Sequence, residues 1–94
     1  MFGDLEIDGT SREVRFEGRA VALTPKEFDL LAFLAEDAGA VFVRQEILEA
    51  VWDAHWYGPT KTLDVHVASL RRKLGDPAVI ETVRGVGFRL RDPS

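Results

Sequence analysis

The side chains best suited to chemistry lie on one face of a predicted helix that spans residues 60–74. Its apolar residues recur at i, i+4, i+7 and i+11, within a stripe about 60° wide at roughly 100° per residue: Leu63, Val67, Leu70 and Leu74. The opposite face collects small, hydroxyl-bearing and basic residues: Lys61, Thr62, Val65, Ala68, Ser69 and Arg72. Because a helix that meets only water has little use for an outward valine, this face is predicted to bind a partner.

This outer face has the properties that reading a DNA duplex requires. The small side chains of Ala68 and Ser69 leave the helix narrow enough for a major groove, which is about 12 Å wide. The hydroxyls of Thr62 and Ser69 can hydrogen-bond to base edges, and Val65 can touch a thymine methyl group. The positive charge for phosphate contacts comes from Lys61, Arg71 and Arg72. A purely solvated face is the alternative, and the combination of an outward valine with small and basic residues favours DNA.

A second candidate contact is Arg84, within the run Thr82-Val83-Arg84-Gly85-Val86-Gly87. Residues 79–90 are predicted to form a β-hairpin that turns at the two glycines. An arginine beside such a turn can reach an adjacent minor groove. It can equally pair with an acidic surface residue, a contact that contributes little to stability. The hairpin pattern alone leaves these two roles open.

The charge distribution also favours an anionic partner, although the net charge of the chain is −4. Residues 1–59 carry 5 basic and 12 acidic residues, a net charge of −7, whereas residues 60–91 carry 7 basic and 3 acidic residues, a net charge of +4. Such polarity can present a basic face to a polyanion while the acidic remainder limits indiscriminate phosphate binding.

Other classes of function are disfavoured by composition and spacing. The 94 residues suit one domain, the chain has no cysteine, and no apolar run approaches the roughly 20 residues of a membrane span. The first residues do not resemble a signal peptide, so a cytoplasmic protein without membrane association is expected. His55 and His66 are eleven positions apart with no carboxylate cluster between them. We therefore expect no metal site, no cofactor and no catalysis.

The rest of the chain predicts a frame that would position the helix and the hairpin. Alternating apolar residues between Leu5 and Leu23 predict a meander of short antiparallel strands with a supporting role. Thr24-Pro25-Lys26-Glu27 is typical of a capping box with proline at the first helical position. The helix that follows is predicted to run to Gly39, with Leu23 and Phe28 as a hydrophobic staple.

A second helix is predicted from about Arg44 to Trp52, after a short apolar turn at residues 41–43. Ile47, Leu48, Val51 and Trp52 lie on its inner side. A loop at residues 53–59 leads to Thr60, the candidate cap of the basic helix, which Gly75-Asp76-Pro77 ends. The predicted fold class is therefore α+β: a winged helix-turn-helix with an N-terminal antiparallel β-meander, three helices and a C-terminal β-hairpin wing.

Several motifs resemble the effector domains of OmpR/PhoB-type response regulators. They are Leu23-Thr24-Pro25-Lys26-Glu27-Phe28-Asp29-Leu30-Leu31, Val51-Trp52, Thr62-Leu63-Asp64-Val65-His66-Val67, Leu70-Arg71, Lys73-Leu74 and Thr82-Val83-Arg84-Gly85-Val86-Gly87-Phe88-Arg89-Leu90. They follow the family's order over nearly the whole chain. The sequence departs from the pattern at Val43, where a serine cap is frequent, and at Ala68 and Ser69, where several relatives carry arginine.

The resemblance implies a sequence-specific transcription regulator of a two-component system, whose third helix reads the major groove. It implies that Arg84, beside Gly85, enters the minor groove, and that Trp52, His66 and Thr82 hold the DNA backbone. The positions implied to meet bases or nearby phosphates are Lys61, Thr62, Val65, Ser69 and Arg71. The loop that contains His55, Trp56 and Tyr57 faces RNA polymerase in some members, which makes the polymerase a further expected partner.

The resemblance also implies how the domain assembles. Such domains normally follow a phosphorylatable receiver domain, which this chain does not contain, so residues 1–94 are expected to form the effector domain alone. Family members commonly bind direct-repeat half-sites as two copies. Because the sequence offers no dimerisation helix, we expect a monomer in solution and a tandem dimer on DNA. The alternative function is a winged-helix protein-interaction module that uses the 53–59 loop and the acidic first half.

Overall fold

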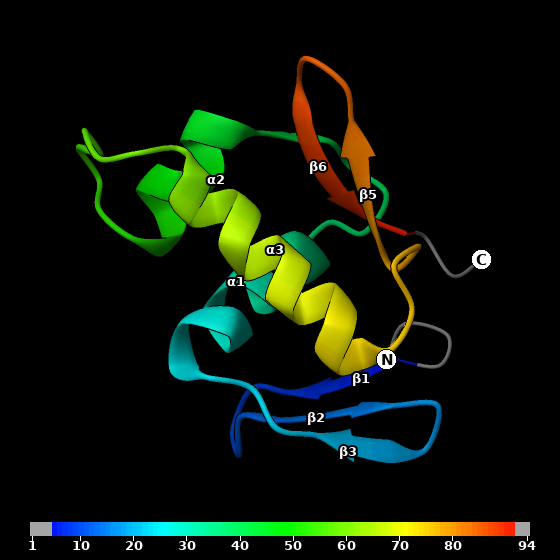
Figure 1. Ribbon diagram of the computed structural model, residues 1–94. Helices are drawn as coiled ribbons and strands as arrows, with labels where there is room; N and C mark the ends of the chain where they lie inside the picture. Colours follow the sequence, from blue (N-terminus) through cyan, green and yellow to red (C-terminus); the bar gives the residue numbers. More distant parts are fainter. Residues whose placement is uncertain (1–4, 92–94) are drawn as a thin grey trace.

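The computed structural model describes residues 5–91, which form three helices between two antiparallel sheets (Figure 1). The first sheet is the predicted meander of β1 (Leu5–Asp8), β2 (Glu13–Phe16) and β3 (Arg19–Val21), in the order β1-β2-β3. Alternate residues of these strands turn towards the helices, so that Leu5, Val14, Phe16 and Val21 are buried. This confirms the predicted N-terminal meander, and the three helices with a second antiparallel sheet confirm the α+β class.

Helix α1 (Pro25–Ala35) begins with the predicted capping box. The Glu27 N–H donates to Thr24 Oγ1 over 3.2 Å, and the Thr24 N–H donates to Glu27 Oε1 over 2.9 Å. The predicted end of the helix at Gly39 was wrong, because the helix ends at Ala35. Gly39 instead adopts a φ of +92° and donates its N–H to the carbonyl of Leu90, where the chain turns towards the second sheet.

The predicted apolar turn at residues 41–43 contains a strand. β4 (Phe42–Val43) pairs with β6 (Gly87–Leu90), which also pairs with β5 (Ile80–Val83). The two glycines of the hairpin therefore have different roles. Gly85 lies in the turn with a φ of +74°, whereas Gly87 lies in β6, where a Cβ atom would overlap the carbonyl of Phe42. The prediction that the hairpin turns at both glycines was wrong for Gly87.

Helix α2 (Arg44–Val51) begins without a capping side chain, since valine has no acceptor to offer. The Val43 N–H still finds a partner in the carboxylate of Glu46, at 3.2 Å. Trp52, the predicted last residue of this helix, is its C-cap. Ile47 and Leu48 are fully buried against α1, as their spacing predicts.

Helix α3 (Lys61–Leu74) buries the predicted stripe of Leu63, Val67, Leu70 and Leu74. Thr60 precedes the helix, but its side chain makes no capping hydrogen bond, which corrects that part of the prediction. Gly75, with a φ of +81°, ends the helix in the left-handed conformation. In residues 5–91 no helix is long and apolar enough to cross a membrane.

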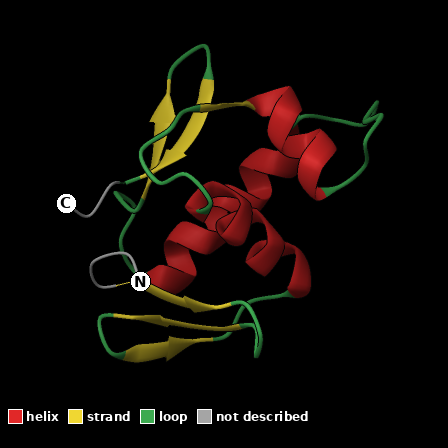
Figure 2. Ribbon diagram, turned by 180° about the vertical axis from the view of Figure 1, so that it is seen from behind, coloured by secondary structure: helices red, strands yellow, loops and turns green. Residues whose placement is uncertain are grey.

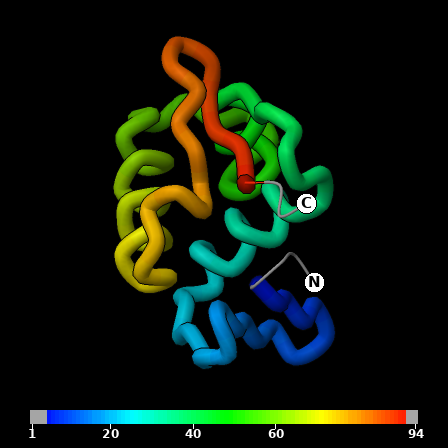
Figure 3. Tube along the Cα trace, turned by 90° about the vertical axis from the view of Figure 1, so that its right-hand side faces the viewer, coloured from blue at the N-terminus to red at the C-terminus, as the bar shows by residue number. Residues whose placement is uncertain are grey.

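The two sheets lie at opposite ends of the helical layer, and the hairpin of β5 and β6 stands away from it as a wing (Figures 2 and 3). Figure 1 shows α3 running across the front of α1, with the wing at one side. This arrangement leaves the outer face of α3 and the tip of the wing on the surface of the molecule, where both can meet one partner.

Candidate nucleic-acid interface

The outer face of α3 is built as its periodicity predicts. Val65 is 64% exposed, and Lys61, Ala68 and Arg72 are also exposed, opposite the buried leucine stripe. Thr62 and Ser69 flank this face and are half-buried. Val65, Ala68 and Arg72 are spaced at i, i+3 and i+7, so they form one continuous stripe along the helix.

Arg71 does not project from this face. Its Nε donates to the carbonyl of Ile80 over 3.0 Å, its Nη2 donates to Thr82 Oγ1 over 2.9 Å, and its guanidinium lies 6.0 Å from the centre of the Phe88 ring. These contacts fasten the wing to α3. The structure therefore brings Arg71 and Thr82 together, with much of the hydrogen-bonding capacity of Arg71 used inside the fold.

A second arginine fastens the other end of α3. The guanidinium of Arg44 holds both carboxylate oxygens of Asp64, at 2.8 and 2.7 Å, and also donates to the carbonyl of Thr60. Its hydrogen bond is the main cause that lowers the pKa of Asp64. The pair neutralises an acidic side chain beside Val65, which lowers the repulsion that a polyanion would meet there. Sequence reasoning missed Arg44, because the pairing joins residues twenty positions apart.

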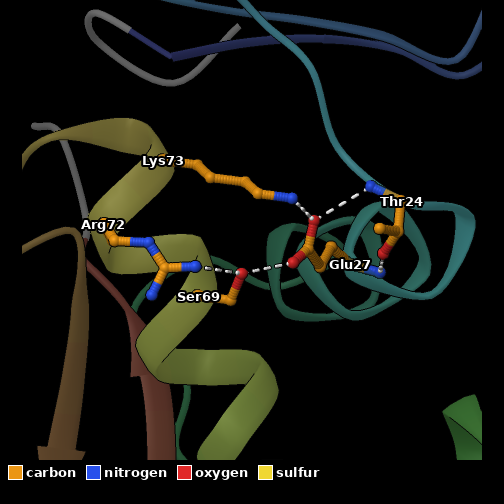
Figure 4. A network of polar contacts seen from close by, with 5 residues as sticks. All are labelled: Thr24, Glu27, Ser69, Arg72 and Lys73. Carbon is orange, nitrogen blue, oxygen red and sulfur yellow. Dashed lines mark hydrogen bonds and ion pairs between the residues drawn. The ribbon is translucent and has the colours of Figure 1, made fainter.

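Glu27, one residue of the α1 cap, is a buried carboxylate that also contacts α3 (Figure 4). Its side chain accepts hydrogen bonds from Ser69 Oγ at 2.5 Å and from Lys73 Nζ at 2.7 Å. Burial alone would raise the pKa of Glu27, but the hydrogen bonds of Lys73, Ser69 and the Thr24 N–H outweigh it and lower that pKa to about 2. Sequence reasoning identified Glu27 only as a helix cap and missed this second role.

Trp52 and His66 lie side by side between α2 and α3. Their ring centres are 4.8 Å apart in an edge-on arrangement, and His66 Nδ1 lies 2.8 Å from the carbonyl of Thr62. A backbone carbonyl only accepts hydrogen bonds, so Nδ1 carries a proton and Nε2 is the remaining polar atom of the ring. Lys26 Nζ lies 5.7 Å from the centre of the Trp52 ring, which places a further cation beside this pair.

The loop between α2 and α3 separates its aromatic residues. Trp56 is half-buried against the core, and its carbonyl accepts a hydrogen bond from Gln45. Tyr57 is 94% exposed, and His55 is also exposed. Gly58 lies so close to the Trp56 ring that a Cβ atom would come within 2.5 Å of it. Trp56 therefore anchors the loop, while the rings of His55 and Tyr57 are exposed.

The tip of the wing carries Arg84 and Gly85, both exposed. The carbonyl of Val83 accepts a hydrogen bond from the N–H of Val86, which closes the turn around them. Among residues 5–91 Arg84 has no salt-bridge partner, so the alternative of a surface ion pair finds no support there. In the same part of the chain, no group of three or more histidine, aspartate and glutamate side chains could hold a metal ion.

Comparison with known proteins identifies the fold and its family. Residues 18–90 match the family model described as "Transcriptional regulatory protein, C terminal". The chain belongs to this family. The chain is 50% identical to the transcriptional regulatory protein CseB of Streptomyces coelicolor and 49% identical to the transcriptional regulatory protein PrrA of Mycobacterium tuberculosis. It aligns over 96% and 95% of its own length but spans only 38% and 40% of theirs.

Solved structures agree with this fold over nearly the whole chain. The DNA-binding domain of Klebsiella pneumoniae RstA, in complex with its RstA box, has a TM-score of 0.87 and 35% identity, with 97% of this chain and 94% of that one covered. The DNA-binding domain of AdeR, in complex with an intercistronic region, has a TM-score of 0.87 and 30% identity, with 99% of both chains covered. Thermotoga maritima DrrB, described as an OmpR/PhoB homologue, has a TM-score of 0.86 and 36% identity, with 97% and 43% covered. The predicted resemblance to OmpR/PhoB-type domains is confirmed.

Proposed function

We propose that this domain binds double-stranded DNA sequence-specifically and thereby controls transcription as the effector part of a two-component response regulator. The observation that carries the proposal is the exposed stripe of Val65, Ala68 and Arg72 on α3, opposite a fully buried core stripe. In this proposal α3 occupies the major groove and the wing places Arg84 in the adjacent minor groove. Relatives of the same fold are described in complex with DNA.

The other interface residues take supporting roles in the proposal. Trp52 and His66 lie together where they can meet one stretch of phosphate backbone, and Thr82 can meet another beside the wing. Lys61 and Thr62 stand at the first turn of α3, where the helix N-terminus also favours anions. Arg71 contributes positive charge while its hydrogen bonds fix the wing.

The proposal extends to partners in the whole protein. The longer relatives support an N-terminal receiver domain that carries the phosphorylation switch, in a protein that works in the cytoplasm. The exposed side chains of the loop, His55 and Tyr57 beside the anchored Trp56, would contact RNA polymerase. Two copies would bind direct-repeat half-sites, with the meander of one copy near the basic wing of the next, while the free domain is a monomer.

The test is selection of bound duplexes from a random library, followed by titration of the selected site at several salt concentrations. If the +4 charge of residues 60–91 stands for about four neutralised phosphates, affinity should fall about 100-fold between 50 and 200 mM salt. An affinity that stays flat with salt, or equal affinity for scrambled DNA, would contradict the proposal and favour a protein-interaction module.

A further inference from the structure

The feature that carries a further inference is the chain of polar contacts that runs from the buried carboxylate of α1 to the outer face of α3 (Figure 4). Glu27, only 4% exposed, accepts the hydrogen bond of Ser69 at 2.5 Å. Ser69 Oγ in turn accepts a hydrogen bond from Arg72 Nη2 at 3.3 Å. Arg72 is exposed on the stripe of Val65 and Ala68, so this series of hydrogen bonds connects the core of the domain to its candidate DNA-reading face.

The direction of each hydrogen bond follows from the chemistry of the groups. With a pKa of about 2, Glu27 is ionised at neutral pH, so its carboxylate can only accept. A serine hydroxyl has one hydrogen, and Ser69 must donate it to the Glu27 carboxylate. Its free lone pairs are then directed to a donor, which is the guanidinium of Arg72. Lys73 donates to the other carboxylate oxygen, Oε1, at 2.7 Å, which leaves Oε2 to Ser69.

This arrangement changes the expected role of Ser69. A hydroxyl that has given its only hydrogen to a buried carboxylate cannot donate to a guanine or to a phosphate oxygen. The neighbouring Arg71 is also committed, since its guanidinium holds Ile80 and Thr82 of the wing. Arg72 is the arginine of α3 that keeps most of its five N–H donors free while one of them is held by the fold.

We infer that Ser69 and Glu27 are positioning residues for DNA recognition, which act through Arg72 rather than by contact with DNA. By holding one guanidinium nitrogen, Ser69 restricts the rotamers of Arg72 before binding, and this reduces the conformational entropy lost when the arginine meets a base or phosphate. The inference rests on the proposed DNA-binding function. It assigns to Arg72 a directed contact that helps to set specificity, and to Ser69 no direct contact.

A double-mutant cycle on Ser69 and Arg72 tests the inference. Affinities for the selected site and for a scrambled duplex are measured by fluorescence anisotropy for the wild type, Ser69→Ala, Arg72→Ala and the double variant. We expect Arg72→Ala to weaken specific binding about 10-fold or more, as for loss of one directed arginine contact. Ser69→Ala should weaken it about 3-fold in the wild-type background and not further once Arg72 is absent.

Two more variants separate positioning from general damage to the fold. Ser69→Thr keeps the hydroxyl and should restore most of the specific affinity that Ser69→Ala loses. Lys73→Gln removes another contact of Glu27 without touching the link to Arg72, so it should weaken binding to both duplexes equally. Circular dichroism confirms that each variant is folded, and only folded variants enter the cycle.

The outcomes distinguish this inference from the proposed function. If the wild type selected no site, the proposed function would fail and the inference with it. If the wild type binds its site but the losses of Ser69→Ala and Arg72→Ala multiply, Ser69 contacts DNA by itself and the inference is wrong. The same conclusion follows if Ser69→Ala binds as the wild type does, or if folded Ser69→Thr binds as weakly as Ser69→Ala.

Discussion

Replacing Glu27 with glutamine should destabilise the domain at neutral pH, and this loss of stability should shrink as the pH falls towards 2. The pKa of Glu27 lies at about 2 instead of its ordinary 4.5, because the contacts with Lys73, Ser69 and the backbone outweigh the cost of burial. A pKa that is lowered in the folded state means that the ionised form stabilises it. This stabilisation is complete above about pH 5 and is lost as the pH falls through the folded-state pKa. At about 1.4 kcal/mol for each tenfold change in the ionisation constant, it amounts to about 3 kcal/mol.

Urea unfolding at a series of pH values, followed by the fluorescence of Trp52 and Trp56, measures this effect. The wild type should exceed Glu27→Gln by about 3 kcal/mol at pH 7 and by about half of that near pH 3. Asp64, whose pKa is also lowered, titrates in both proteins, so its contribution cancels in the difference. A difference that stays constant between pH 7 and pH 3 would refute the reasoning, since it would show that the charge of Glu27 is not what stabilises the fold.

Asp29→Asn is the matched control on the same helix. Asp29 pairs with Arg12 at 2.8 Å, but the two side chains are 41% and 49% exposed, whereas Glu27 is buried. Exposed pairs contribute about 0–1 kcal/mol. The control variant should therefore lose less than about 1 kcal/mol at pH 7, and a loss as large as that of Glu27→Gln would show that burial is not the deciding difference.

Four further predictions concern the reading face, the wing and the assembly. Val65→Glu should abolish specific DNA binding with an unchanged circular dichroism spectrum, because the exposed position has no core role; unfolding would show otherwise. Gly87→Ala should destabilise the fold by about 2 kcal/mol or more in urea, since its Cβ would overlap the carbonyl of β4, whereas Gly9→Ala, with open space around it, should be almost neutral. Arg84→Ala should weaken specific binding and reduce the salt slope by about 1 if the arginine meets DNA, and an unchanged slope would remove it from the interface. Light scattering should show that the free domain is a monomer. Inserting five base pairs between the half-sites rotates one of them by about half a turn and should abolish cooperative binding. A stable free dimer, or cooperative binding that is unaffected by the insertion, would contradict this arrangement.

The features of the fold that could be predicted from the sequence are those encoded within a few residues. The cap of α1 is formed by the adjacent residues Thr24-Pro25-Lys26-Glu27, and the buried side of α3 follows from the spacing of four apolar residues. The strand at Phe42–Val43 could not be predicted in this way, because two residues show no alternation and their partner lies more than forty positions further along the chain. The structural need for Gly87 depends on the same distant pairing.

The candidate site also has one feature that the sequence could predict and one that it could not. Exposure of Val65, Ala68 and Arg72 follows from helical geometry, so the reading face was predictable as a surface. The sequence could not predict which hydrogen-bond donors remain available on that surface, because their partners lie on other helices and strands. The bonds of Arg71 to the wing and of Ser69 to α1 exist only once the helices and the hairpin have packed.

The exposed positions of α3 have a consequence for how regulators of this kind can diverge. Val65 and Ala68 contribute almost nothing to the packing of the core, whereas Leu63 and Val67, on the same helix, are buried. If α3 reads DNA as proposed, substitutions at the first pair would change the preferred target without a cost in folding, while the second pair keeps the helix in place. After a gene duplication, two copies could acquire separate sets of promoters by changing a few such side chains, and cross-talk between their signalling pathways would fall without any redesign of the scaffold.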